Sequence, residues 1–433
     1  MRETNYPQIQ ETTYYEKLEN GLEVILIPKK GFQKTYALFS TKFGSIDHHF
    51  VPRGETEAVR MPDGIAHFLE HKLFEKEEGD VFQLFGKQGA SANAFTSFTR
   101  TAYLFSTTAQ LRNNLLTLID FVQEPYFTDQ TVNKEKGIIA QEIQMYDDSP
   151  DWRLFFGLLE NLYPDQPVHV DIAGTVESIQ QITPESLYKN YETFYHPGNM
   201  KLVLAGKLEP EEVMSWIRKN QSEKEFLPDE PIERIYPPID LDQIVPYRSI
   251  YLPVNRPKAL VGVRGTETST SNSRTVKKRL TMELLLNLLF GETSSNYLEL
   301  YDEGLIDDSF SYEYSYEEQF DFVAIGGDTR APEKLSEKVK KILQQASSSK
   351  ELNEEHFRLN KRKMIGQLLQ ALNSPEYIAN QFFDFYYEDV TLFDLVPIVE
   401  QLTLSDAKEA AATYFLDEVT SVFHVLPERE VQI

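Results

Sequence analysis

Cysteine is absent from the 433 residues of this chain. Disulfides, thiol catalysis and cysteine-ligated zinc or iron sites are therefore excluded, so any metal must be bound by histidine and carboxylate side chains. Basic residues are also few, because 43 Lys and Arg stand against 68 Asp and Glu and give a formal net charge of -25. That charge repels phosphate backbones and anionic membrane surfaces, so we do not expect nucleic acid as a partner.

Long hydrophobic runs are missing as well. No stretch approaches the roughly 20 apolar residues that a helix needs to span a bilayer, and we expect no membrane span. The first 21 residues, MRETNYPQIQETTYYEKLENG, have neither the basic region nor the apolar region of a signal peptide. We therefore expect a cytoplasmic protein. The composition, with 41% hydrophobic and 26% charged residues, is that of a globular chain, and the length indicates at least two domains.

Periodicity divides the chain into strands and helices on both sides of a proline-rich stretch. Before it we expect strand-like runs around an Asn20-Gly21 turn within 14–27, further strands at 35–43, 102–107 and 200–205, and helices at 65–85, 111–122, about 129–146, 183–195 and 210–219. After it we expect strands at 259–263, within 309–327 and at 420–425, and helices at 275–290, 332–346, 352–372 and 405–415. The order suggests a duplicated α+β unit, with domains at 1–220 and 254–433 and an acidic linker at 221–253.

The segment His67-Phe68-Leu69-Glu70-His71 carries the clearest chemical signal. Two histidines at i and i+4 lie on one helix face, where both imidazoles can reach one ion. Glu70 lies beside them, and a carboxylate next to a catalytic zinc can take a proton from the water that the metal activates. The simplest alternative is a solvated helix face with two incidental histidines, but the apolar flank of the segment argues against it.

A catalytic zinc usually has a third protein ligand. Glu135 and Glu142 are candidates, because they lie seven residues apart and so share one face of the expected helix over two turns. One of them can bind the metal while the other orients a ligating histidine. Spacing alone does not choose between them. His48 and His49, which follow a strand, are expected at the surface.

The histidine motif and its surroundings resemble the inverted zincins of the pitrilysin family, which includes insulin-degrading enzyme and mitochondrial processing peptidase. The similarity covers the first 210 residues densely, through GIAHFLEHKLF (64–74), SANAFTSFTRTAYLF (91–105), KGIIAQEIQMYDDSP (136–150), AGTVESIQQIT (173–183) and YHPGNMKLVLAG (195–206). The resemblance implies one Zn²⁺ per chain with Glu142 as the third ligand, Glu135 as the residue that orients a ligand, and a substrate-binding strand edge at Asn93, Ala94, Phe95 and Thr96.

The family fold, by resemblance, is a pair of similar α+β domains, each a mostly antiparallel sheet packed with helices, that forms half of a clamshell chamber. The second domain here carries no metal motif. Tyr301 and Asp307 stand where active members have an Arg and a Tyr that bind the substrate carbonyl, and Tyr312 or Tyr314 is a weak substitute. The departure implies a heterodimer with a metal-free homologous subunit that supplies this pair, with a homodimer as the alternative.

The function expected from these residues is hydrolysis of peptides, or of unfolded or precursor segments, by a zinc-activated water with Glu70 as general base. Two alternatives remain open. The first is a non-catalytic scaffold subunit of a family heterodimer, and the second is a dedicated processing peptidase for one precursor peptide.

Overall fold

A seven-stranded sheet forms the framework of the first half of the protein. The computed structural model describes residues 1–266, 273–384 and 390–428. The strand order is β1 (Arg2–Tyr6), β2 (Glu11–Lys17), β3 (Glu23–Pro28), β11 (Met200–Gly206), β4 (Thr35–Thr41), β10 (Thr101–Thr107) and β9 (Ala90–Thr96). Every neighbouring pair is antiparallel except β3 with β11. Strand β9 therefore lies at an edge of the sheet.

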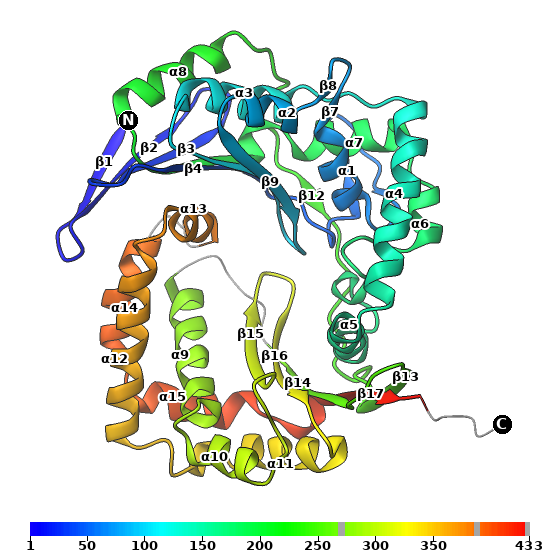
Figure 1. Ribbon diagram of the computed structural model, residues 1–433, viewed down its shortest axis with the longest axis vertical. Coiled ribbons are helices and arrows are strands. Elements are labelled where there is room, and N and C mark those ends of the chain that lie inside the picture. Colours follow the sequence, from blue (N-terminus) through cyan, green and yellow to red (C-terminus); the bar gives the residue numbers. More distant parts are fainter. Residues whose placement is uncertain (267–272, 385–389, 429–433) are drawn as a thin grey trace.

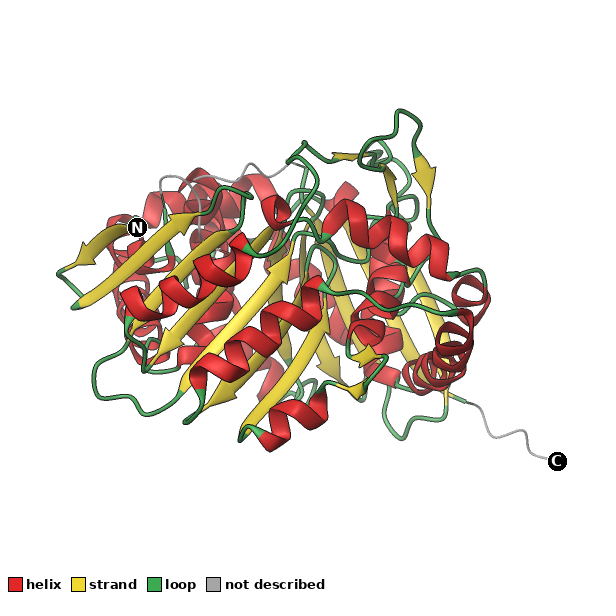
Figure 2. Cartoon of the chain, turned by 90° about the horizontal axis from the view of Figure 1, so that it is seen from above, coloured by secondary structure: helices red, strands yellow, loops and turns green. Residues whose placement is uncertain are grey.

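Helices cover one face of this sheet because its strands alternate apolar side chains toward them. Val24, Leu26, Ala37 and Phe39 point into a core with these helices, whereas their neighbours in sequence point to the opposite face. The helices are α1 (Ile65–Leu73), α2 (Phe82–Lys87), α3 (Leu111–Gln123), α4 (Asp129–Asp147), α7 (Pro184–Phe194) and α8 (Pro210–Ser222). Figure 2 shows helices lying across the strands in the view from above.

A five-stranded sheet forms the framework of the second half. Its order is β13 (Tyr247–Leu252), β17 (Thr420–Pro427), β14 (Lys258–Arg264), β16 (Asp321–Asp328) and β15 (Ser311–Tyr316). Its helices are α9 (Ser273–Phe290), α10 (Ser295–Asp302), α11 (Pro332–Gln344), α12 (Glu354–Ala371), α13 (Pro375–Asp384), α14 (Leu395–Gln401) and α15 (Leu404–Tyr414). Two sheets with packed helices confirm the α+β class and the two-domain fold. No described helix combines the length and the apolar character that crossing a membrane requires.

The two halves exchange a helix. Helix α5 (Pro150–Leu162) belongs to the first half by sequence but packs on β14 and β17, and α13 packs in return on β4 and β11 (Figure 1). Gly157 allows the close approach, because a Cβ there would lie 2.2 Å from the Phe423 ring. Asn161 also donates a hydrogen bond to the Val422 carbonyl. One apolar core therefore runs through both halves.

The predicted linker at 221–253 contains two strands. β12 (Glu233–Arg234) pairs with β5 (His49–Val51), and β13 joins the second sheet beside β17. The domain boundaries at 1–220 and 254–433 stay a prediction, and packing crosses them in both directions.

The single helix predicted for 65–85 is wrong. Helix α1 ends at Leu73, a short hairpin of β7 (Glu75–Lys76) and β8 (Gly79–Asp80) follows, and α2 begins at Phe82. Gly79 has a φ of 124°, which other residues rarely adopt, and Lys76 donates hydrogen bonds to the Phe121 and Glu124 carbonyls at the end of α3. These contacts fix the hairpin. The strands β1, β9 and β13 and the helices α5 and α13 did not emerge from periodicity.

Candidate metal centre

The start of α1 sets the direction of the histidine-bearing helix. Gly64 precedes its first residue with a φ of 85°, and a Cβ at this position would lie 2.2 Å from the Ala173 carbonyl oxygen. Only glycine fits such a left-handed position so close to another backbone. The Asp63 residue before it pairs with His48, with 3.1 Å between His48 Nδ1 and Asp63 Oδ1. His48 is buried, so its predicted surface position is wrong.

The two histidines and one glutamate converge on a common point. The rings of His67 and His71 have centroids 4.6 Å apart on α1. From α4, the Glu142 carboxylate lies 3.7 Å from His67 Nε2 through Oε1 and 3.6 Å from His71 Nε2 through Oε2. One ligand atom from each of the three residues lies within 4.8 Å of the others, the one such group in the described parts of the chain. Two imidazoles and a carboxylate are a donor set that zinc accepts in catalytic sites.

Glu135 lies on the far side of His71 from this point. Its Oε1 is 3.0 Å from His71 Nδ1, so the carboxylate accepts a hydrogen bond from Nδ1–H and the lone pair of Nε2 stays free for a metal. His67 differs, because its buried Nδ1 has no hydrogen-bond partner among the described residues. The structure therefore separates the two glutamates that spacing could not, with Glu142 toward both imidazoles and Glu135 behind one.

Glu70 lines the same cavity as the three converging residues. This cavity measures about 340 Å³ and is also lined by residues of β9 and by Tyr146, Trp152 and Asp171. Thr96 Oγ1 donates a hydrogen bond to Glu70 Oε2 at 2.6 Å, which fixes the carboxylate against the edge strand. A larger cavity of about 690 Å³ adjoins it through Glu70, His71, Asn93 and Ala94. Open space therefore continues from the candidate centre past Asn93 and Ala94 of β9.

Burial shapes the ionisation of these groups. It lowers the pKa of His67 to about 3, with a smaller contribution from His71, so the imidazole is neutral and ready to bind a cation. Burial also raises the pKa of Glu70. Burial alone would lower the pKa of His71, but the hydrogen bond to Glu135 and the charges of Glu70 and Glu142 together raise it.

Three residues that line the cavity were not identified from the sequence, namely Tyr146, Trp152 and Asp171. Tyr146 lies one turn after Glu142, so helical spacing offered a signal for it. Trp152 and Asp171 come from the next helix and from a loop, and no pattern in the sequence connects them with the motif.

The predicted substrate segment lies beside the centre. Asn93, Ala94, Phe95 and Thr96 are the second half of β9 and all line the metal cavity. Tyr301 and Asp307, which stand where the Arg/Tyr pair is expected, do not line this cavity.

Tyr301 is half exposed and stacks on Tyr297, and Asp307 pairs with Arg256. Tyr312 packs near Phe290 and Tyr314 is buried in the core, so neither belongs to the metal centre.

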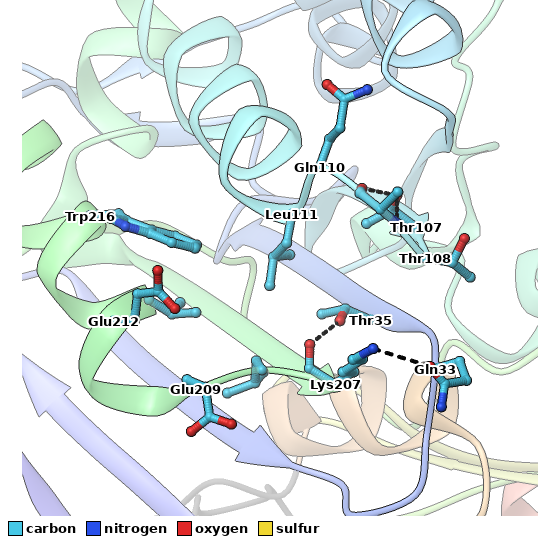
Figure 3. A pocket seen from close by; sticks show the side chains of 13 residues that line it. Gln33, Thr35, Thr107, Thr108, Gln110, Leu111, Lys207, Glu209, Glu212 and Trp216 are labelled. Carbon is cyan, nitrogen blue, oxygen red and sulfur yellow. Dashed lines mark hydrogen bonds between the residues drawn. The ribbon is translucent and has the colours of Figure 1, made fainter.

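A third cavity, of about 300 Å³, lies apart from these where α3 and α8 begin (Figure 3). Lys207 and Gln33 form a hydrogen bond at its lower edge, and Thr35 donates one to the Lys207 carbonyl. It shares no lining residue with the metal cavity and is lined by no histidine.

Two family models match the chain. Residues 50–176 match the model described as insulinase (peptidase family M16), and residues 181–364 match the model described as the peptidase M16 inactive domain. A protein named uncharacterized zinc protease YmfH, from Bacillus subtilis (strain 168), is 52% identical over 423 residues, which cover 98% of both chains.

Solved structures give the same picture. An M16-like peptidase from Alicyclobacillus acidocaldarius has a TM-score of 0.92 at 38% identity, over 96% of this chain and 99% of that one. The periplasmic protease PqqL of Escherichia coli shares the fold at a TM-score of 0.74 and 15% identity, and this chain matches 48% of its length. The fold and the histidine-glutamate cluster thus place the chain in a peptidase family, and its relatives in that family are named zinc proteases. The chain belongs to the M16, or insulinase, family.

Proposed function

We propose that the protein is a zinc-dependent endopeptidase that hydrolyses peptides or unfolded or precursor segments. The observation that carries the proposal is the convergence of His67, His71 and Glu142 on one point, with Glu70 in the same cavity. When bound, zinc supplies a Lewis acid that polarises the scissile carbonyl and makes a coordinated water more acidic.

The chain's own residues divide the remaining work. Glu70 takes a proton from the attacking water and delivers it to the leaving amine, a role worth roughly 100- to 10,000-fold in rate. Glu135 holds His71 with Nε2 toward the centre. Thr96 holds Glu70 by a hydrogen bond to its Oε2.

The substrate backbone adds to the free edge of β9 as a further strand. Strand β10 pairs with one side of β9, and the other side has no partner strand in the described sheet. The Ala94 N–H donates to the Asn93 side chain at 2.9 Å rather than to β10, so this group faces the free edge. An extended peptide would take the place of the Asn93 oxygen there and lie across the cavity.

A second chain completes the chamber in this proposal. The match to half of PqqL and the absence of the Arg/Tyr pair at Tyr301 and Asp307 support a metal-free homologous partner, with a homodimer as the alternative. Co-purification from the native cell, followed by mass spectrometry of the bound chain, tests this directly. Recovery of this chain alone as a monomer with full activity would contradict it. The cytoplasmic location stays a prediction.

The replacement Glu70→Gln tests the chemistry. We expect one zinc per chain in both proteins, unchanged unfolding temperature, and a loss of at least about 100-fold in kcat, because the amide can accept from Thr96 but cannot take a proton. The assay uses unstructured peptides and the co-purified partner. Full activity of the variant would refute the role of Glu70. Absence of zinc from the wild-type protein purified without chelators would favour the scaffold alternative.

A further inference from the structure

Glu142 is held by a single neighbour. Tyr146 lies four residues later on α4, and its hydroxyl donates a hydrogen bond to Glu142 Oε1 at 2.8 Å. Among the described residues no other group donates to this carboxylate at hydrogen-bond distance, since both imidazole contacts exceed 3.5 Å. The Glu142 side chain is partly exposed and has three rotatable bonds, so the tyrosine selects one of several orientations.

Tyr146 is itself held by a neighbour that also lines the cavity. Its ring stacks on Trp152 of α5, with centroids 4.5 Å apart and an interplanar angle of 15°. The indole N–H of Trp152 donates to Asp171 Oδ2, and Asp171 Oδ1 accepts the Ala173 N–H at 2.9 Å. Ala173 also provides the carbonyl that Gly64 approaches at the start of α1. One connected set of contacts therefore joins the loop at the histidine helix to the glutamate on α4.

We propose that Tyr146 is a positioning residue for Glu142, and that the Asp171–Trp152–Tyr146 contacts set the zinc affinity of the centre. This inference rests on the proposed zinc site. It assigns to Glu142 the same kind of support that Glu135 gives to His71, where a hydrogen bond orients the metal-binding atom. His67 receives no such support at Nδ1 among the described residues, and its burial in α1 restricts the ring instead.

The test measures zinc affinity, by competition with a chromophoric chelator at pH 8, rather than peptide cleavage. Tyr146→Phe keeps the stacked ring and removes one hydrogen bond. We expect zinc to bind about 10- to 100-fold more weakly. Tyr191→Phe is the matched control, because the Tyr191 hydroxyl donates to the Val122 carbonyl at 2.9 Å outside the metal cavity. It should leave zinc affinity within about twofold of wild type.

Trp152→Phe is the second variant. It retains a ring but loses the donor to Asp171, so we expect a smaller loss of zinc affinity in the same direction. This arm keeps the inference testable if Tyr146→Phe fails to fold. Unchanged zinc affinity in both variants would overturn the proposal.

A double-mutant cycle separates positioning from a general structural effect. In a Glu142→Ala background Tyr146→Phe should change zinc affinity by less than twofold, because the residue it acts through is gone. An equal loss in both backgrounds would show that Tyr146 does not act through Glu142. Wild-type protein that binds no zinc would overturn the proposed centre itself, whereas zinc binding that is insensitive to Tyr146 overturns only this inference.

Discussion

At the scale of single residues, the two carboxylates of α4 meet the histidine pair from different sides. Glu135 is buried and accepts from His71 Nδ1, whereas Glu142 faces both Nε2 atoms. The hydrogen bond to His71 and its charge together outweigh burial and lower the pKa of Glu135, so it stays ionised at neutral pH. An ionised acceptor makes the imidazole a better ligand than a neutral one.

Replacing Glu135 with Gln should therefore weaken zinc binding without removing the hydrogen-bond acceptor. We expect about a 10-fold rise in the zinc dissociation constant. Chelator competition measures the change. The exposed Glu185→Gln on α7 provides the control, and equal zinc affinity of the two variants would contradict the orienting role.

The residues of the centre differ in how far the sequence could reveal them. His67, Glu70 and His71 lie within five consecutive residues of one helix, so local spacing was enough to place them together. The choice between Glu135 and Glu142 needed either the family resemblance or coordinates, because both lie on the same face of α4. Trp152 and Asp171 reach the site only through tertiary packing, which no local pattern encodes.

At the scale of elements, the geometry of the candidate metal centre depends on where α1 begins. Gly64 holds a φ of 85° against the Ala173 carbonyl, and His67 follows three residues later. The helix predicted for 65–85 is wrong beyond Leu73, where the β7–β8 hairpin follows. Lys76 of this hairpin donates hydrogen bonds to carbonyl groups at the end of α3. The segment EKEEGD (75–80) has no apolar residue and includes Gly79, so the apolar spacing supports a helix only as far as Phe74.

Gly64→Ala should lower stability and zinc affinity together. The left-handed conformation costs about 1–3 kcal/mol for a residue with a Cβ, and the clash with Ala173 must shift α1. Gly137→Ala on α4 is the matched control. Its added Cβ would meet nothing within 4 Å, so we expect a gain of about 0.5–1 kcal/mol in the free energy of unfolding. Urea unfolding of both zinc-free variants measures the contrast, and a neutral Gly64→Ala would refute the argument.

At the scale of the whole molecule, two hairpin turns join the halves. Phe98, between β9 and β10, packs edge-on against Phe320, between β15 and β16, with ring centroids 5.4 Å apart. Arg100 of the first turn also pairs with Asp384 at the end of α13, at 2.9 Å. The turn that follows β9 thus contacts two elements of the second half, the β15–β16 turn and α13. Sequence order suggested two units, but it could not show this contact or the exchange of α5 and α13.

Glu317 makes this junction sensitive to pH. Burial at the tip of the β15–β16 hairpin raises its pKa to about 7; Asp384 adds to the shift, and Arg279 and Arg100 oppose it. Its ordinary pKa in an unfolded chain is about 4.3. Between these values the folded protein binds a proton that the unfolded chain does not, so the contribution of Glu317 to stability is full below about pH 4.3 and is lost as the pH rises through 7.

Glu317→Gln removes this ionisation while keeping the shape of the side chain. We expect the free energy of unfolding of the variant, relative to that of wild type, to rise by about 1–3 kcal/mol between pH 5 and pH 8. The reason is that only the wild type must bury a charge at the higher pH. Urea unfolding at the two pH values, with zinc removed, gives the difference. The exposed Glu337→Gln on α11 should show no such change. If the variant and wild type differ by the same free energy of unfolding at both pH values, Glu317 is ionised throughout and paired with Arg100 or Arg279. The junction then does not respond to pH through this residue.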